Sequence, residues 1–196
     1  MIAGYHLIFG TYGFWLPNDP RGSWSDFVCS YELLRYGEAT TTTERRSVAH
    51  RQHDHELRLA AKSALRYPPV QFTGIQARAV GQGFAEYLQK SKIKVWACAI
   101  LPDHVHLVTG RLPIKAEQLV IQLKGAATRR LIAEDLHPLR QFPTKKNRPP
   151  RCFAQGEWKV FLDLEDILRA IRYVEQNPIK EHKPQQNWSF VTPYLL

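Results

Sequence analysis

Hydrophobic residues along the chain follow two periods, which predict four strands and three long helices. The predicted strands, rich in aromatic and β-branched residues, are 5–16, 93–100, 104–109 and 157–162. The predicted helices, in which apolar residues recur every three or four positions, are 73–91, 116–136 and 163–177. The first six elements follow the βαββαβ, or ferredoxin-like, order. We therefore expect an α+β fold: an antiparallel sheet, two helices on one face, and an added C-terminal helix across the sheet.

One polar segment interrupts this order. Residues from about 21 to 72 contain a run of four threonines at 40–43 and a charged segment of helical character around 54–65. A chain of 196 residues suits one compact domain and is long enough for a substantial core. We expect a single domain spanning residues 1–196, with an insertion at about 21–72 and a tail from about residue 184.

Two histidines flank one valine at the start of the third predicted strand. Side chains alternate between the faces of a strand, so His104 and His106 share one face while Val105 and Leu107 point to the other. Neutral imidazole is the commonest nitrogen ligand for divalent metals. An isolated His-x-His pair is more often incidental. A pair on a predicted hairpin strand, after the turn at 101–103, predicts two ligands of a metal site.

The helix predicted at 163–177 has an apolar stripe and a polar side. Asp163 is the predicted N-cap, and Pro178 is predicted to end the helix. Tyr173 lies far from the centre of the stripe, and Arg169, Gln176 and Asn177 fall on the same polar side. The predicted buried stripe consists of Leu164, Ile167, Leu168, Ile171 and Val174.

Tyr173 and Asn177 are neighbours on successive turns of this helix. If their side docks over the two histidines, the Asn177 oxygen is a candidate third metal ligand and Tyr173 a candidate nucleophile. A nearby cation, the metal or Arg169, would favour the phenolate. Attack on a phosphodiester would give a covalent phosphotyrosine, which conserves the energy of the broken bond for rejoining. The alternative is an exposed helical tyrosine followed by an Asn-Pro cap.

The charge of the chain favours a polyanionic partner. Lysine and arginine number 27 against 18 acidic residues, a net charge of +9. Residues 140–151 contain five basic and no acidic side chains, punctuated by prolines. A solvated surface is the alternative interpretation. The candidate nucleic-acid contacts are Lys124, Arg129, Arg130, Lys145, Lys146, Arg148, Arg151 and Arg169.

Other features narrow the class of protein. No apolar run approaches the ~18–20 residues that span a bilayer, and the start of the chain lacks the features of a signal peptide. The three cysteines are odd in number and widely spaced, which favours reduced thiols and a cytoplasmic location. His50, His53 and His55 could form a second metal cluster, but surface histidines are the favoured interpretation.

Several motifs together resemble the single-tyrosine HUH transposases, in particular the REP-associated tyrosine transposases. They are TYGFWLPNDPRGSW near the start, ILPDHVHLV, LKGAATRRL and RAIRYVEQNP, and together they cover most of the chain. The resemblance implies a ferredoxin-like fold and a single-stranded DNA endonuclease and ligase dependent on Mg²⁺ or Mn²⁺. It assigns His104 and His106 as metal ligands and Tyr173 as nucleophile. Some relatives carry glutamine where this chain has Asn177, and Gln176 is the fallback ligand.

We therefore expect a transposase that cleaves and transfers single-stranded hairpin DNA through a 5′-phosphotyrosine. Two alternatives remain close to this function: a replication initiator with the same chemistry, and a DNA-binding regulator that no longer cleaves. A metal hydrolase for small molecules fits the charge poorly. The resemblance is compatible with a homodimer, because some relatives exchange the tyrosine helix while others act as monomers.

Overall fold

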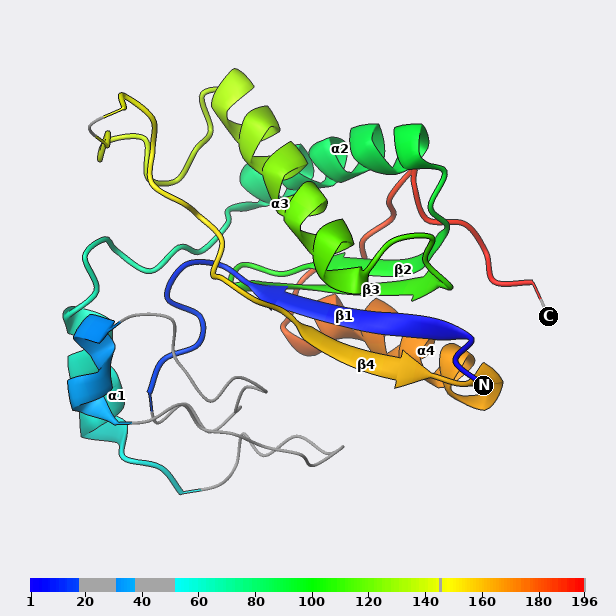
Figure 1. The fold of residues 1–196 in the computed structure, drawn as a ribbon, viewed down its shortest axis with the longest axis horizontal. Helices are drawn as coiled ribbons and strands as arrows, with labels where there is room; N and C mark the ends of the chain where they lie inside the picture. The colour runs from blue at the N-terminus through cyan, green and yellow to red at the C-terminus, as the bar shows by residue number, and fades with distance from the viewer. Residues whose placement is uncertain (18–30, 38–51, 145, 196) are drawn as a thin grey trace.

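The computed structural model describes residues 1–17, 31–37, 52–144 and 146–195. Their order along the chain is strand, insertion, and then the remaining elements of the predicted pattern (Figure 1). The elements are β1 (Gly4–Gly10), the 3₁₀ helix η1 (Tyr31–Tyr36), α1 (His55–Ser63), α2 (Gly74–Ser91), β2 (Val95–Ile100), β3 (His104–Gly110), α3 (Ala116–Ala133), β4 (Trp158–Leu162) and α4 (Leu164–Lys180).

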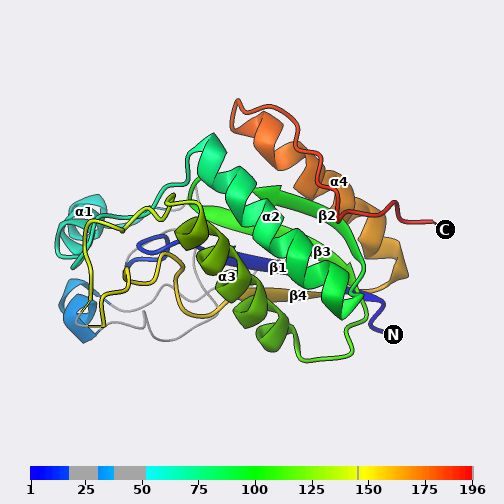
Figure 2. The ribbon, with the colours of Figure 1, turned by 90° about the horizontal axis from the view of Figure 1, so that it is seen from above.

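The four strands form one sheet in the order β2-β3-β1-β4, and each neighbouring pair is antiparallel. This is the ferredoxin-like topology predicted from the sequence. Helices α2 and α3 cross one face of the sheet side by side, and α4 lies on the opposite face (Figures 1 and 2). Helix α1 lies beyond one end of the sheet, away from both termini.

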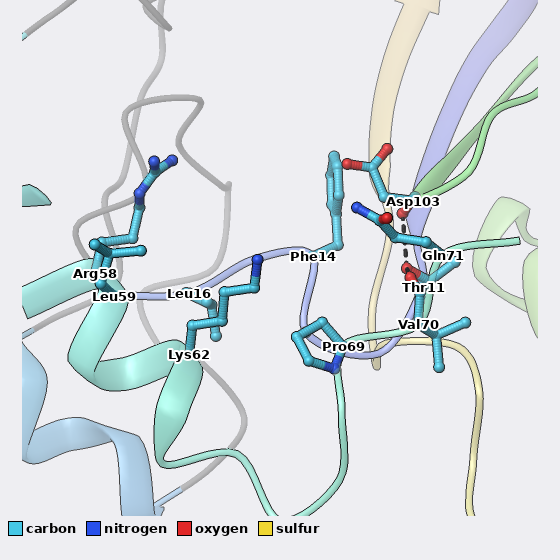
Figure 3. A pocket seen from close by; sticks show the side chains of 11 residues that line it. Thr11, Phe14, Leu16, Arg58, Leu59, Lys62, Pro69, Val70, Gln71 and Asp103 are labelled. Carbon is cyan, nitrogen blue, oxygen red and sulfur yellow. Dashed lines mark hydrogen bonds between the residues drawn. The ribbon is translucent and has the colours of Figure 1, made fainter. Parts of the chain in front are cut away.

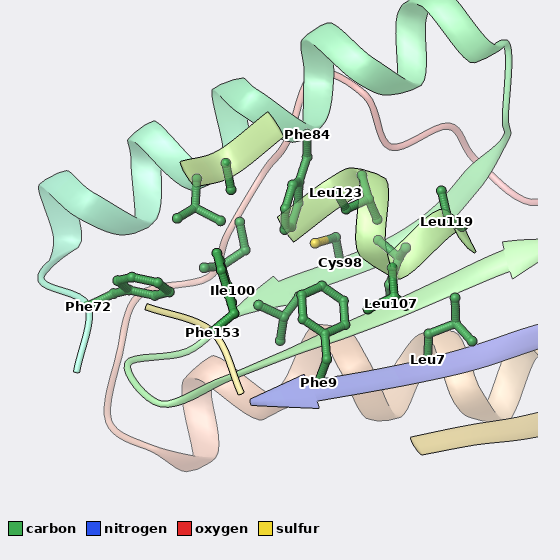
Figure 4. Packing of buried hydrophobic residues seen from close by; sticks show 14 of the residues in the cluster. Leu7, Phe9, Phe72, Phe84, Cys98, Ile100, Leu107, Leu119, Leu123 and Phe153 are labelled. Atoms are coloured by element: carbon green, nitrogen blue, oxygen red, sulfur yellow. The ribbon is translucent and has the colours of Figure 1, made fainter. Parts of the chain in front are cut away.

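The main hydrophobic core lies between the sheet and helices α2 and α3. Leu7 and Phe9 of β1 and Leu107 of β3 pack with Phe84 of α2 and Leu123 of α3 (Figure 4). These strand residues alternate with the ones that face α4, as the two-residue period of a strand requires.

A second cluster holds α4 on the other face of the sheet. It joins strand residues to the inner side of the helix: Ala97, Ala99, Val108, Leu162, Ile167, Ala170, Ile171 and Val174. Both faces of the two central strands are therefore covered. The side chains of β3 that face α4, His104 and His106 among them, lie between the sheet and this helix.

The first strand is shorter than predicted, since β1 ends at Gly10 instead of residue 16. The chain turns there: the Phe14 amide donates to the Thr11 carbonyl, and Gly13 has a positive φ of 83°. The Thr11 hydroxyl is 2.6 Å from the carbonyl of Val70, which ties the turn to the end of the insertion. The aromatic residues that favoured a strand here pack in a loop instead.

The insertion contains the predicted helix, because α1 begins after its N-cap Asp54 and ends at Ser63. The four threonines at 40–43 lie outside the described residues, as do the other parts of 18–30 and 38–51. The division into a single domain with an insertion stays a prediction.

The predicted stripe of α4 is wrong in two positions. Leu164 and Leu168 are 69% and 36% exposed, while Ala170 and Asn177 are buried. The buried side is therefore rotated toward Asn177. Pro178 also does not end the helix, which continues to Lys180. Proline costs little near a helix end, where few hydrogen bonds remain to be lost.

The tail from about residue 184 covers the edge of the sheet. The Gln186 amide donates to the carbonyl and accepts from the amide of Ile100, both at 2.8 Å. Thr192 donates its amide to the Val95 carbonyl at 2.8 Å. The tail thus satisfies backbone groups of the edge strand β2 that would otherwise be open to pairing.

Candidate active site

His104 and His106 face each other on the α4 side of β3. Their Nε2 atoms are 3.0 Å apart. Two ligands at right angles around a metal, each at about 2.1 Å, would be separated by roughly 3 Å. The two ring nitrogens therefore have the spacing of adjacent ligands in an octahedral site.

Asp103 fixes the orientation and the tautomer of His104. Its Oδ1 atom is 2.6 Å from His104 Nδ1, and since a carboxylate can only accept, the imidazole Nδ1–H donates. The lone pair of His104 is then on Nε2, the atom that faces His106. The Phe14 ring stacks on the His104 ring, with centroids 4.9 Å apart. A carboxylate behind a histidine is the usual support of a metal ligand.

His6 is a third histidine of the site, which the sequence analysis missed. It lies on β1, and its Nε2 is 2.9 Å from Nδ1 of His106. To bind a metal through Nε2, His106 has to hold its proton on Nδ1, where His6 Nε2 is the acceptor. Only the pairing of β1 with β3, which sets Ile8 opposite His106, brings the two rings together. Nothing in the local pattern around residue 6 predicts that contact.

Burial keeps two of these imidazoles neutral. It lowers the pKa of His6 to about 4. It also lowers the pKa of His106 well below the usual value of 6.5, and the neighbouring His104 and His6 lower it further. Neutral imidazole is the form that binds metals, so the site is prepared for ligation at neutral pH.

Tyr173 of α4 lies over the histidines. Its ring meets those of His6 and His106 edge-on, with centroids 5.8 and 5.6 Å apart. The side chain is 45% exposed, so it borders the site while remaining open to solvent. The nearby cation is not Arg169, which is exposed and paired with Asp166. It is Lys180, whose Nζ is 5.1 Å from the centroid of the Tyr173 ring.

Asn177 is the better of the two candidates for a third ligand. It is buried one turn after Tyr173, whereas Gln176 is exposed. Its Nδ2 atom has no hydrogen-bond partner among the described residues. A buried amide N–H without an acceptor is costly, so Nδ2 is placed to donate to a bound group, while Oδ1 is the atom that could ligate a metal. Within the same residues no cluster of three His, Cys, Asp or Glu side chains could hold a metal, so a third protein ligand would have to be of another type.

The candidate nucleic-acid contacts on α3 are not on the face of the histidines. Lys124 donates to the carbonyls of Ala154 and Gly156 at 2.8 and 2.6 Å, and burial lowers its pKa to about 8. It acts as a tether for the chain before β4 instead of an open phosphate contact. Arg130 pairs with Glu86 and Glu134, while Arg129 is exposed.

The basic loop ends near the site. Lys146, Arg148 and Arg151 are exposed, and Lys145 lies outside the described residues. The segment after Arg151 runs beside the end of β1, where the Ala154 amide donates to the Gly10 carbonyl at 3.0 Å. Gly10 pairs with His104 across the sheet. The loop therefore leads toward the histidine end of the sheet.

The structure describes two histidines of the second group, His53 and His55. The rings of His53 and His55 are 5.9 Å apart in an edge-on contact, His55 is exposed, and His50 lies outside the described residues.

Comparisons with known proteins give weak likenesses. No protein-family model and no curated protein matches the chain. A solved REP-associated tyrosine transposase bound to a REP hairpin is similar at 13% identity and a TM-score of 0.47, over 97% of this chain and 76% of that one. A transposase candidate from Deinococcus radiodurans R1 is similar at 16% identity and a TM-score of 0.41, over 90% and 91%. At such values, function has to be argued from the side chains of the site.

Among the described residues, no helix combines the length and the apolar character needed to cross a bilayer.

Proposed function

We propose that this protein is a DNA strand transferase of the single-tyrosine HUH transposase type, with Tyr173 as nucleophile and His104 and His106 as metal ligands. The observation that carries the proposal is the contact of Tyr173 with His106, whose Nε2 lies 3.0 Å from that of His104. A tyrosine hydroxyl beside two convergent imidazoles that could hold a metal suits nucleophilic attack on a phosphodiester. The motifs that resemble this family contain the same three residues.

The residues divide the chemistry between them. His104, His106 and Asn177 would hold Mg²⁺ or Mn²⁺, which would polarise a phosphoryl oxygen of the DNA. Asp103 keeps His104 in the tautomer that ligation needs, and His6 would accept the Nδ1 proton of His106 when His106 binds through Nε2. Lys180 lies over the Tyr173 ring and places a cation beside the nucleophile.

The reaction balances without a further reagent. Tyr173 Oη releases its proton to solvent and forms a bond to phosphorus, while the bond from phosphorus to the 3′ oxygen breaks. The 3′ oxygen takes a proton and leaves as a hydroxyl, and the 5′-phosphate stays on the tyrosine. A second 3′-hydroxyl can reverse these steps, which joins the retained 5′ end to a new strand.

The test is a search for the covalent adduct. The wild-type chain, Tyr173→Phe and the control Tyr87→Phe are incubated with a library of single-stranded hairpins, with Mn²⁺ or with a chelator. We expect an adduct in wild type and control, mapped by mass spectrometry to the peptide containing Tyr173 and absent with chelator. Tyr173→Phe should bind hairpins as wild type does and give no adduct.

Two results would contradict the proposal. An adduct that persists in Tyr173→Phe would place the nucleophile elsewhere. Tight hairpin binding by wild type with no adduct on any member of the library would favour the regulator that binds DNA without cleaving it.

A further inference from the structure

A small cavity adjoins the histidine site on the side of the insertion. It lies between the turn after β1 and helix α1 and has a volume of about 130 Å³ (Figure 3). Pockets that enclose a whole drug-sized ligand measure roughly 300–1,000 Å³, so this one suits a single small group. Nothing in the proposed chemistry of Tyr173 uses it.

The cavity shares a wall with the candidate active site. Asp103 and Phe14 both line it. Asp103 is the carboxylate that holds His104, at 2.6 Å, and Phe14 is the ring that stacks on His104, at 4.9 Å. A group bound in the cavity would therefore be separated from the His104 imidazole by the thickness of one side chain.

The opposite wall carries two cations from α1. Arg58 and Lys62 are four residues apart, on one side of the helix, and both line the cavity. Figure 3 shows the Lys62 ammonium directed into the space between α1 and Phe14. In the described part of the chain neither forms an ion pair with a carboxylate, although Arg58 has one long contact of 3.4 Å with the His55 ring.

The described residues that line the cavity carry a net positive charge. Among them Asp103 is the one acidic residue, and it is already engaged by His104. Gln71 adds a carboxamide that can donate hydrogen bonds. Two cations, an amide donor and a small volume match a phosphate group in charge and size better than a base or a sugar.

We propose that the cavity binds a phosphodiester group of the substrate strand, next to the phosphate that Tyr173 attacks. The proposal rests on the proposed function for the identity of the strand. Single-stranded DNA carries a phosphate at every nucleotide, so a strand held at the histidines brings a neighbouring phosphate close to this wall. Helix α1 would then position the strand, which gives the insertion a role in the reaction.

The experiment uses a fluorescent thymidine decamer and measures its dissociation constant at several salt concentrations. The double variant Arg58→Gln/Lys62→Gln is compared with wild type and with Arg78→Gln/Lys90→Gln, which removes the same charge from exposed positions of α2, on the other side of the sheet. Thermal melting of each variant checks that it folds. A decamer with neutral methylphosphonate linkages is the second probe.

We expect the Arg58/Lys62 variant to bind the charged decamer about 3–10-fold more weakly and with a salt slope about 0.7 smaller, the change for one lost phosphate contact on a single strand. The α2 control should match wild type, and the neutral decamer should bind wild type and the Arg58/Lys62 variant equally. Equal loss in the Arg58/Lys62 variant and in the α2 control would overturn the proposal, because the effect would then be one of net charge alone.

The outcome of this binding experiment can be distinguished from the outcome of the adduct experiment on Tyr173. If hairpins form the tyrosine adduct but the decamer binds both double variants equally, the phosphate site is wrong and the proposed function stands. If no adduct forms but the loss is specific to the Arg58/Lys62 variant, the phosphate site stands and the cleavage chemistry is wrong.

Discussion

Each of the two candidate metal ligands has a neighbour that bonds to its other ring nitrogen. Asp103 supports His104, and His6 supports His106. These contacts differ in kind, because a carboxylate is a fixed acceptor while an imidazole can donate or accept. The His6–His106 pair therefore has two proton arrangements, of which one leaves Nε2 of His106 available to a metal.

Replacing His6 should weaken metal binding without changing either candidate ligand. In His6→Phe the acceptor for His106 Nδ1 is lost, and we expect Mn²⁺ to bind about 10–100-fold more weakly, the usual cost of removing such a partner. His6→Gln retains a side-chain acceptor and should recover part of the affinity. Isothermal titration with Mn²⁺ in the absence of DNA measures both.

Tyr5→Phe is the matched control, since Tyr5 is on the same strand and packs on the other face of the sheet. Equal Mn²⁺ affinity in wild type and His6→Phe would exclude a supporting role for His6.

The local sequence pattern predicted the placement of some residues of the candidate site and missed that of others. Alternation along a strand suffices to place His104 and His106 on one face, and helical spacing suffices to relate Tyr173 to Asn177. The His6–His106 contact joins residues one hundred positions apart. It depends on which strands pair and in what register. The residues around His6 indicate neither the pairing nor the register.

The docking of α4 decides whether Tyr173 meets the histidines. The apolar period placed Leu164 and Leu168 in the buried stripe, but the structure buries Ala170 and Asn177 instead. Alanine and asparagine contribute little to a hydrophobic pattern. The predicted buried stripe was therefore centred closer to the two leucines than the observed one is. The rotation toward Asn177 is what brings Tyr173 to the margin of the sheet.

Two alanine substitutions test this orientation. Ile167 is fully buried against the sheet, so Ile167→Ala should lower the free energy of unfolding by about 2–4 kcal/mol through lost packing and the cavity left behind. Leu164→Ala, on the exposed side, should change it by less than about 0.5 kcal/mol. Urea unfolding of both variants makes the comparison. A larger loss for Leu164→Ala would show that the helix docks by the stripe that its apolar period indicates.

At the scale of the molecule, three buried imidazoles make stability depend on pH. Burial lowers the pKa of His6 and of His137 from 6.5 to about 4, and that of His106 also falls well below 6.5. At a pH between these lowered pKa values and 6.5, the unfolded chain binds more protons than the folded one. Stability is therefore retained above pH 6.5 and is lost as pH falls toward 4.

For His6 the full shift corresponds to about 3 kcal/mol, at 1.36 kcal/mol for each pH unit. We expect urea unfolding at pH 7, 6 and 5 to show a progressive loss of stability. His137→Gln, remote from the candidate ligands in sequence, removes one of the three groups and should reduce the slope. A stability that rises on acidification over this range would contradict the assignment of buried neutral histidines.

The α+β topology was predictable because it depends on the order of elements. The end of β1 was not predictable, because the aromatic residues after Gly10 form a turn whose contacts are with residues distant in sequence. That turn carries Phe14 to His104 and forms one wall of the cavity opposite α1. The part of the fold that distinguishes this chain from a plain βαββαβ unit is thus the part that local pattern describes least well.

The hydrogen-bond register between β1 and β3 also decides whether the candidate active site can form. A slip of one residue would turn His104 and His106 into the core beneath α2 and α3 and bring Val105 and Leu107 under Tyr173. A sheet in that register cannot hold His104, His106 and His6 together with Tyr173. On the proposed function, a copy of the protein folded with this slip lacks the candidate metal ligands beside its nucleophile and cannot nick DNA.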